Sequence, residues 1–289
     1  MIPAAFSYDR PSSLDEALGL LSQHAGSAKI IAGGQSLLPL LKLRLAAAER
    51  LIDIGRLSEL RGVRYADDGS AEIGGLMTYR EILESTKLSW VGEAVAHIGD
   101  VQVRNRGTVG GAIAHADPAS DLPAIGLALD YSAVLRSTRG ERVVPFDEFF
   151  RGAFETAAEP DEILVSIRRG PLPVGVGGAY AKLAQPASGY SIVGVAAVVG
   201  HAHGVLGSTT FDHVRVAITG VGDVAYRAKA VEDALIGTVC GQTEIAAAAK
   251  HATDGVTVNG DIHADREYRT AMAEVYVRRA LEAARARSS

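Results

Sequence analysis

The amino-acid sequence predicts an α+β protein of two parts, and three observations carry this prediction. Short apolar runs typical of buried strands alternate at uneven spacing with segments of helical apolar periodicity. A segment dense in proline and glycine, residues 169–175, is the best candidate for a linker. Beyond it, three strand-like segments precede three helical ones. This order favours mixed sheets over a regular parallel sheet.

Composition and charge narrow the class of protein. The 289 residues are 47% hydrophobic and 22% charged, which is ordinary for a globular protein with real cores. A net charge of -5 argues against nucleic acid as a partner. No apolar run approaches the roughly twenty residues of a membrane span. The single cysteine, Cys240, excludes an internal disulfide framework and fits a reducing cytoplasm. It also means that this chain cannot supply the four thiolates of an iron–sulfur cluster.

In the first part of the chain, capping residues and short apolar runs predict the elements. Ser13 and Glu16 form a capping-box pattern that opens a helix through about His24, and Thr78 and Glu81 open another. The other expected elements are strands at 29–32, 51–54 and 71–74, helices at about 36–45 and 120–129, and strands at about 132–136 and 163–168.

In the second part, the same reasoning predicts three strands and three helices. The strands are expected near 179–184, 191–199 and 213–219, and the helices near 227–236, 243–252 and 265–285. The segment Gly220–Ala225 matches a dinucleotide-binding pattern. It lacks a clear βαβ unit and an acidic residue after a second strand, so a tight structural turn is the better interpretation.

The first candidate site is the segment from Ile30 to Pro39. An apolar strand ends in Gly33-Gly34, and a segment with helical spacing follows at once. This geometry presents backbone N–H groups to a phosphate. Glycine lets the backbone approach closely, and Gln35 and Ser36 add hydrogen-bonding side chains.

A second glycine pair strengthens the phosphate-binding interpretation. Thr108-Val109-Gly110-Gly111 forms a second glycine loop, and two such loops suit a dinucleotide better than a mononucleotide. The nearby His115, Asp117 and Asp121 lack the partners of a metal site, so a carboxylate binding a sugar hydroxyl is the preferred interpretation. Tyr190 lies on a turn before a strand, where an aromatic ring covers a flat ligand or simply faces solvent.

Together these segments resemble the FAD-binding medium subunit of molybdenum-containing hydroxylases, the group of carbon monoxide, nicotine and xanthine dehydrogenases. The resemblance covers essentially the whole chain and rests on residues 32–39, 104–111 and 117–121. It implies a FAD-binding domain of the para-cresol methylhydroxylase type over residues 1–175, with subdomains of about 1–57 and 58–175. It also implies a smaller C-terminal flavoprotein domain, residues 176–289, of three antiparallel strands with helices.

The resemblance further implies which residues hold FAD. Residues 29–37 match the wall around the pyrophosphate, residues 108–115 match its other face, and Asp121 matches an acceptor for cofactor hydroxyls. Ile163 and Leu164 match an adenine contact, while Lys182 and Tyr190 match positions near the flavin ring. Gln35 and Ala112 depart from the histidine and asparagine of some relatives. The full predicted set is Lys29, Ile30, Ile31, Ala32, Gly33, Gly34, Gln35, Ser36, Leu37, Thr108, Gly110, Gly111, Ala114, His115, Asp121, Ile163, Leu164, Lys182 and Tyr190.

The resemblance also explains why the chain has only one cysteine, because the iron–sulfur clusters belong to another subunit. The family implies a small partner subunit with two [2Fe–2S] clusters and a large partner subunit with the molybdenum cofactor, assembled as a dimer of heterotrimers. This subunit then receives electrons on FAD and passes them to an external acceptor, with no metal site and no catalytic acid, base or nucleophile of its own. Two alternatives stay open: a self-contained flavin oxidoreductase of the same fold, and a scaffold subunit that has lost FAD.

Overall fold

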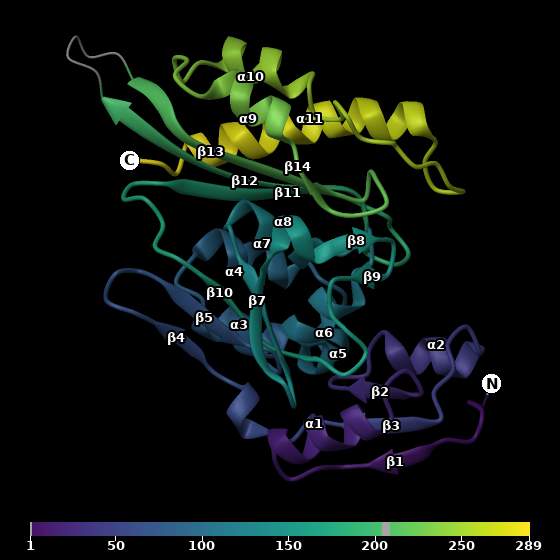
Figure 1. Ribbon diagram of the computed structural model, residues 1–289. Helices are drawn as coiled ribbons and strands as arrows, with labels where there is room; N and C mark the ends of the chain where they lie inside the picture. Colours follow the sequence, from purple (N-terminus) through teal and green to yellow (C-terminus); the bar gives the residue numbers. More distant parts are fainter. Residues whose placement is uncertain (1, 204–208) are drawn as a thin grey trace.

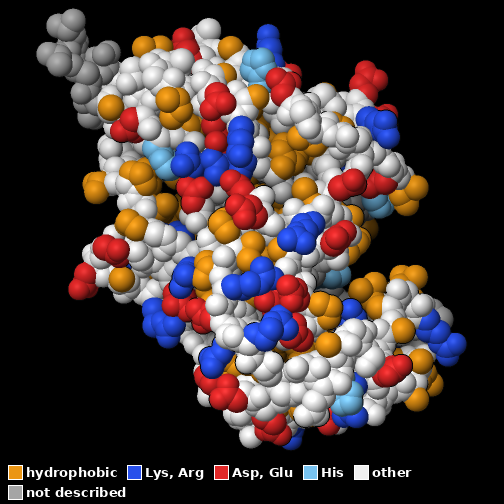
Figure 2. Space-filling model, in the orientation of Figure 1, with side chains coloured by type: hydrophobic (Ala, Val, Ile, Leu, Met, Phe, Trp, Pro, Cys, Tyr) orange, Lys and Arg blue, Asp and Glu red, His pale blue; other side chains and the backbone are white. Residues whose placement is uncertain are grey.

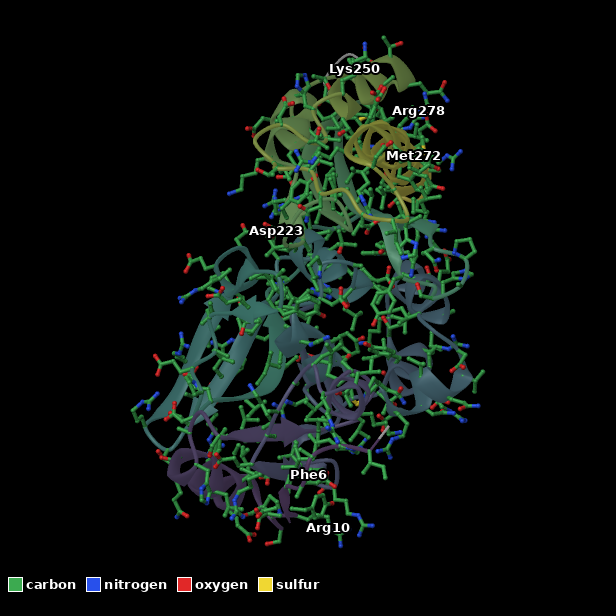
Figure 3. The ribbon with its side chains drawn as sticks, turned by 90° about the vertical axis from the view of Figure 1, so that its right-hand side faces the viewer. Phe6, Arg10, Asp223, Lys250, Met272 and Arg278 are labelled. Atoms are coloured by element: carbon green, nitrogen blue, oxygen red, sulfur yellow. The ribbon has the colours of Figure 1, made fainter. Side chains whose placement is uncertain are left out.

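The computed structural model describes residues 2–203 and 209–289, which form three main layers (Figure 1). A small parallel sheet of order β1-β3-β2 lies at the N-terminal end. The side view places Phe6 and Arg10 at this end, and Lys250, Met272 and Arg278 at the opposite end (Figure 3). The elements of the first layer are β1 Ser7–Asp9, α1 Leu14–Gln23, β2 Ala28–Ile31, α2 Leu37–Leu43, β3 Arg50–Asp53 and the 3-10 helix Ser58–Leu60.

The middle layer is a five-stranded antiparallel sheet of order β4-β5-β10-β6-β7. One face shares a core with α1, in which Leu18 and Ile52 pack near Val134. Helices cover the other face, where Ile113 and Ile125 join a core with Leu135. The elements are β4 Val63–Tyr65, β5 Ala71–Gly74, α3 Tyr79–Ser85, α4 Ser89–Ala96, α5 Val101–Arg106, α6 Val109–His115, α7 Asp121–Ala128, β6 Ser132–Ser137, β7 Gly140–Pro145, α8 Phe146–Phe149, β8 Phe150–Gly152, β9 Glu155–Thr156 and β10 Ile163–Arg169.

The C-terminal layer is an antiparallel sheet of order β11-β12-β13-β14. Its three long strands are those expected from the sequence, and β14 adds two residues at the edge. Helices cover both faces, with α9 to α11 above the sheet and α4 and α7 below it in the view of Figure 1. The elements are β11 Gly177–Ala184, β12 Ser191–His203, β13 Thr209–Thr219, β14 Tyr226–Arg227, α9 Lys229–Leu235, α10 Gln242–Ala249 and α11 Arg266–Arg285.

Strand β12 explains why this sheet is buried on both sides. Val193 and Val195 pack into the core with α11, whereas Ala196 and Val198 pack into the core with α7. Successive side chains of a strand point to opposite faces, so a continuous apolar run serves two layers at once. Helix α7 is buried along its whole length between the middle and C-terminal sheets.

The predicted α+β class is confirmed, but several local expectations need correction. The segment after Thr108, expected to be a loop, is the first turn of α6, because the Thr108 hydroxyl accepts a hydrogen bond from the Gly111 N–H at 3.1 Å and caps the helix. Helices α4 and α5 and the hairpin β8–β9 were not expected. Residue Leu88 at the N-cap of α4 offers no side-chain cap, so that helix has no start signal.

Candidate cofactor-binding site

A cavity of about 370 Å³ lies between the N-terminal layer and the helices of the middle layer. The space-filling view shows the molecule hollowed on its right-hand side, above the lobe that carries α2 (Figure 2). All residues of the predicted site line this cavity except Asp121, Lys182 and Tyr190. The predicted residues that line it are Lys29, Ile30, Ile31, Ala32, Gly33, Gly34, Gln35, Ser36, Leu37, Thr108, Gly110, Gly111, Ala114, His115, Ile163 and Leu164.

The first wall is the turn from β2 into α2, which exposes a run of backbone donors. In the described part of the chain, the backbone N–H groups of residues 33–37 have no protein acceptor. The next N–H group, of Leu38, donates to the Gly34 carbonyl at 3.0 Å. Gly34 has a φ of +76°, in the left-handed region that glycine adopts without strain. Successive free N–H groups in such a concavity bind anionic oxygens.

The sequence led us to expect that these glycines let the backbone approach a phosphate, but in the structure two of them face other backbone segments. A Cβ on Gly33 would lie 1.7 Å from the carbonyl oxygen of Arg106, and one on Gly110 would lie 2.7 Å from that of Gly75. Both glycines therefore let one backbone segment pack against another. They build the wall, while the free N–H groups of the turn remain available to a ligand.

The second wall is helix α6, whose exposed residues Gly111 and Ala114 face the cavity. The Thr108 hydroxyl oxygen accepts from the Gly111 N–H, which leaves its own hydrogen free to donate. The His115 ring packs on Phe154, with ring centroids 5.1 Å apart. Burial lowers the pKa of His115, although Asp117 partly opposes this, so the imidazole is neutral at neutral pH.

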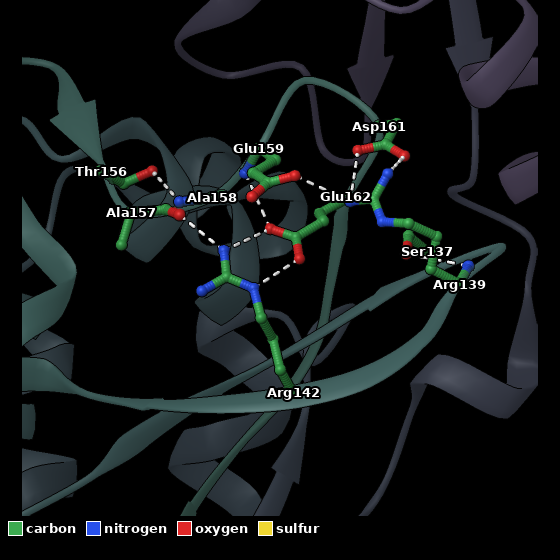
Figure 4. A network of polar contacts seen from close by, with 9 residues as sticks. All are labelled: Ser137, Arg139, Arg142, Thr156, Ala157, Ala158, Glu159, Asp161 and Glu162. Carbon is green, nitrogen blue, oxygen red and sulfur yellow. Dashed lines mark hydrogen bonds and ion pairs between the residues drawn. The ribbon is translucent and has the colours of Figure 1, made fainter.

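Ile163 and Leu164, which the resemblance matches to an adenine contact, are the first two residues of β10. They directly follow Glu162, which belongs to a network of charged side chains (Figure 4). Arg142 donates from Nε to Glu162 Oε1 at 2.6 Å and from Nη2 to Glu162 Oε2 at 2.7 Å. Burial alone raises the pKa of Glu162, but the hydrogen bonds from Arg142 and from the Glu159 N–H lower it overall. Arg139 also bonds Asp161 and Glu159, so the segment that leads into β10 is held from both sides.

The remaining predicted residues form a second group, between α7 and the C-terminal sheet. Asp121 accepts at Oδ1 from the Tyr180 hydroxyl and from Ser191 Oγ, and at Oδ2 from Lys182 Nζ at 2.8 Å. The side chains of Asp121 and Lys182 are 5% and 10% exposed. Tyr190 is 46% exposed and directly precedes Ser191 of this group. Its partial burial, and then the nearby Asp117 and Asp121 carboxylates, raise the pKa of Tyr190.

Several cavity residues were missed by the sequence reasoning, and Tyr79 and Phe154 are the largest of them. Tyr79 directly follows the capping residue Thr78, so this part of the sequence was interpreted only as the start of a helix. Phe154 is 60% exposed and has a φ of +60°, which is rare for an aromatic residue. An aromatic in a glycine-containing turn was its only sequence signal.

Over residues 2–203 and 209–289, no group of three or more His, Cys, Asp or Glu side chains is arranged to hold a metal ion. Within the same ranges, no helix combines the length and the apolar character needed to cross a membrane.

Comparisons with known proteins agree with this arrangement. The family model described as "FAD binding domain in molybdopterin dehydrogenase" matches residues 4–170, and the "CO dehydrogenase flavoprotein C-terminal domain" matches residues 178–284. The carbon monoxide dehydrogenase medium chain of Hydrogenophaga pseudoflava is 41% identical over 292 residues, covering 99% of each chain. The nicotine 6-hydroxylase medium subunit of Paenarthrobacter nicotinovorans is 33% identical, over 98% of this chain and 99% of the relative.

Solved structures show the same similarity in three dimensions. A carbon monoxide dehydrogenase from Hydrogenophaga pseudoflava matches with a TM-score of 0.94 and 41% identity, over 100% of both chains. The quinoline 2-oxidoreductase of Pseudomonas putida 86 matches with a TM-score of 0.89 and 32% identity, over 98% of both chains. Fold and cavity thus define a FAD-binding flavoprotein subunit of an oxidoreductase. The chain belongs to the family of FAD-binding medium subunits of molybdenum hydroxylases.

Proposed function

We propose that this chain holds FAD in the cavity between β2–α2 and α6, receives electrons from the [2Fe–2S] clusters of a small partner subunit and passes them to an external acceptor. The run of free N–H donors at residues 33–37, opposite the wall of α6, carries this proposal. FAD supplies the redox chemistry when bound, and the protein supplies binding and orientation.

The proposed roles of individual residues combine the family resemblance with the lining of the cavity. The N–H groups of the β2–α2 turn and the Thr108 hydroxyl would donate to the pyrophosphate oxygens. The neutral imidazole of His115 would form part of the cavity wall without adding a charge to it. Ile163 and Leu164 would contact adenine, while Lys182, Tyr190 and Asp121 would lie toward the flavin half, beside the C-terminal sheet.

The proposal extends to the assembly and its location. A large partner subunit with the molybdenum cofactor would oxidise the substrate, and the three subunits would form a dimer of heterotrimers. Relatives of this chain are known as a medium chain, a subunit alpha and a subunit beta, which supports a multi-subunit complex. We place the complex in the cytoplasm, with which the free thiol of Cys240 is compatible.

We also propose that the FAD-binding domain spans residues 1–175, with subdomains of about 1–57 and 58–175, and that the flavoprotein C-terminal domain spans residues 176–289. The separate middle and C-terminal sheets support this division. The two family models also match on either side of residues 171–177.

The decisive experiment is a titration of the full-length chain with FAD, followed by absorption and fluorescence. Ala114 is exposed on the cavity wall, so Ala114→Glu places a negative charge near the proposed phosphate site. We expect FAD binding at least about tenfold weaker, which corresponds to about 1.4 kcal/mol. Ala114→Gln, of the same size but neutral, is the matched control and should lose much less affinity.

The outcomes separate the alternatives. A wild-type chain that binds no FAD would be a scaffold, and the proposal would be wrong. Equal affinity in the Glu and Gln variants would place the pyrophosphate elsewhere. Co-expression with its partners tests the relay: a chain that oxidises a substrate alone, without a cysteine-rich small chain and a molybdenum-containing large chain, would be a self-contained flavin oxidoreductase.

A further inference from the structure

Tyr79 is the first residue of α3, and its backbone is held from both sides. Thr78 and Glu81 form a complete capping box at the start of this helix. The Tyr79 N–H donates to the Gly107 carbonyl at 3.1 Å, one residue before Thr108 on the second cavity wall. A bridge between Thr78 and Thr108 adds a second link. The position of the Tyr79 side chain is therefore tied to the wall that would hold the pyrophosphate.

The Tyr79 ring is buried and lines the cavity. The residue is 8% exposed, and its ring packs so closely on Gly107 that a Cβ there would lie 2.8 Å from Tyr79 Cε2. Its hydroxyl makes no hydrogen bond to any described residue, and its oxygen is not one of the buried polar atoms that lack a partner, so the oxygen is accessible from the cavity that Tyr79 lines. An accessible hydroxyl without a protein acceptor is free to donate a hydrogen bond to a ligand in the cavity.

Three half-buried tyrosines have hydroxyls that are bonded to protein acceptors. The Tyr180 hydroxyl donates to Asp121, that of Tyr226 donates to the Ala252 carbonyl at 3.0 Å, and that of Tyr65 donates to the Ser85 carbonyl at 3.3 Å. The acceptor for Tyr79 is thus expected to come from whatever occupies the cavity.

The surroundings of Tyr79 indicate which part of the cavity its hydroxyl faces. Burial, followed by the Asp121 carboxylate and the Tyr190 hydroxyl, raises the pKa of Tyr79 well above its ordinary value. The group therefore stays protonated and can donate at any physiological pH. Asp121 is bonded to β11 and β12, so this side of the cavity is the one nearest the C-terminal sheet.

We propose that the Tyr79 hydroxyl donates a hydrogen bond to the flavin half of bound FAD, to a ribityl or ring acceptor atom, and is a binding and positioning residue of this site. The inference rests on the proposed FAD site and adds a residue that the family resemblance did not supply.

The test is Tyr79→Phe in the full-length chain, which keeps the ring and its packing on Gly107 and removes only the hydroxyl. We expect the Kd for FAD to rise about fivefold, as for the loss of one neutral hydrogen bond. The melting temperature of the FAD-free chain should stay the same or rise, because no protein bond is lost. The absorption bands of the bound flavin should shift, because a polar contact to it is removed.

Tyr226→Phe is the matched control, since it removes a buried hydroxyl that bonds a protein carbonyl outside the cavity. It should lower the melting temperature of the FAD-free chain and leave the Kd for FAD unchanged. An unchanged Kd and flavin spectrum in Tyr79→Phe would overturn the inference while leaving the FAD site intact. A wild-type chain that binds no FAD would instead overturn the proposed function itself.

Discussion

Individual glycines in this chain are needed for different structural reasons, although the sequence alone does not distinguish them. Gly33 faces the Arg106 carbonyl so closely that no side chain fits between them, whereas Gly19 in α1 has nothing within 4 Å of an added Cβ. Glycine at a contact between two backbones cannot be replaced without moving one of them. Glycine in an open helix position only costs conformational entropy.

We predict opposite effects of alanine at these two glycines. Gly33→Ala should destabilise the FAD-free chain by about 1–3 kcal/mol, the usual cost of overpacking. Gly19→Ala should stabilise it by up to about 1 kcal/mol, because alanine favours the helix. Thermal unfolding of both variants measures the difference. Similar melting temperatures would mean that the turn does not pack against Arg106 as described.

His115 gives a pH dependence whose sign follows from its lowered pKa. Because the folded-state pKa lies below the unfolded value of about 6.5, the unfolded chain binds the proton more readily. The contribution of His115 to stability is complete above that pH and is lost as the pH falls below it. We expect His115→Asn to flatten the decline in stability between about pH 6.5 and 5. An unaltered slope in urea unfolding at several pH values would contradict this.

At the scale of elements, caps and apolar runs predicted most helices and strands that bound the site. Strand β2 and helices α1, α3 and α7 begin within a residue or two of the expected positions. Helix α5 escaped prediction because none of its residues is buried, so it has no apolar face to recognise. Strand β7 was not predicted because it is short, carries charged residues near its start and pairs with a single neighbour, β6, at the edge of its sheet.

Helix α6 provides a test of its cap. Thr108→Ala removes the hydroxyl that accepts the Gly111 N–H and should cost about 1 kcal/mol of stability. It should also weaken FAD binding, since the proposed pyrophosphate donor is lost. Thr108→Ser keeps the hydroxyl and is expected to behave like the wild type in both melting and FAD titration. Loss of binding in the serine variant would point to the Thr108 methyl group instead.

At the scale of the whole molecule, a small polar cluster joins α7 to the C-terminal sheet. Asp121 bonds Lys182, Tyr180 and Ser191. The nearby Thr219 hydroxyl lies 2.7 and 2.9 Å from the Pro118 and Ser120 carbonyl oxygens, which share its one hydrogen. These contacts hold the segment between α6 and α7 against the sheet. They would keep the cavity and Tyr190 in one relative position.

We predict that the Asp121–Lys182 pair behaves as a buried ion pair. Asp121→Asn leaves the Lys182 ammonium buried without its counter-charge and should cost about 3 kcal/mol or more. Adding Lys182→Met should recover part of that loss, because the unpaired charge is removed. A double-mutant cycle on the free energy of unfolding measures the coupling. Additive effects of the two substitutions would show that the pair is not coupled.

The sequence by itself determined the α+β class, the FAD-binding family and most of the residues that line the cavity. Caps, apolar runs and glycine pairs act between near neighbours, so they can be recognised in a linear pattern. Only the tertiary structure decided that Gly33 meets Arg106, that Asp121 bonds the C-terminal sheet outside the cavity, and that the Tyr79 hydroxyl has no partner among the described residues. Each of these depends on segments far apart in the chain, whose approach is set by packing rather than by local sequence.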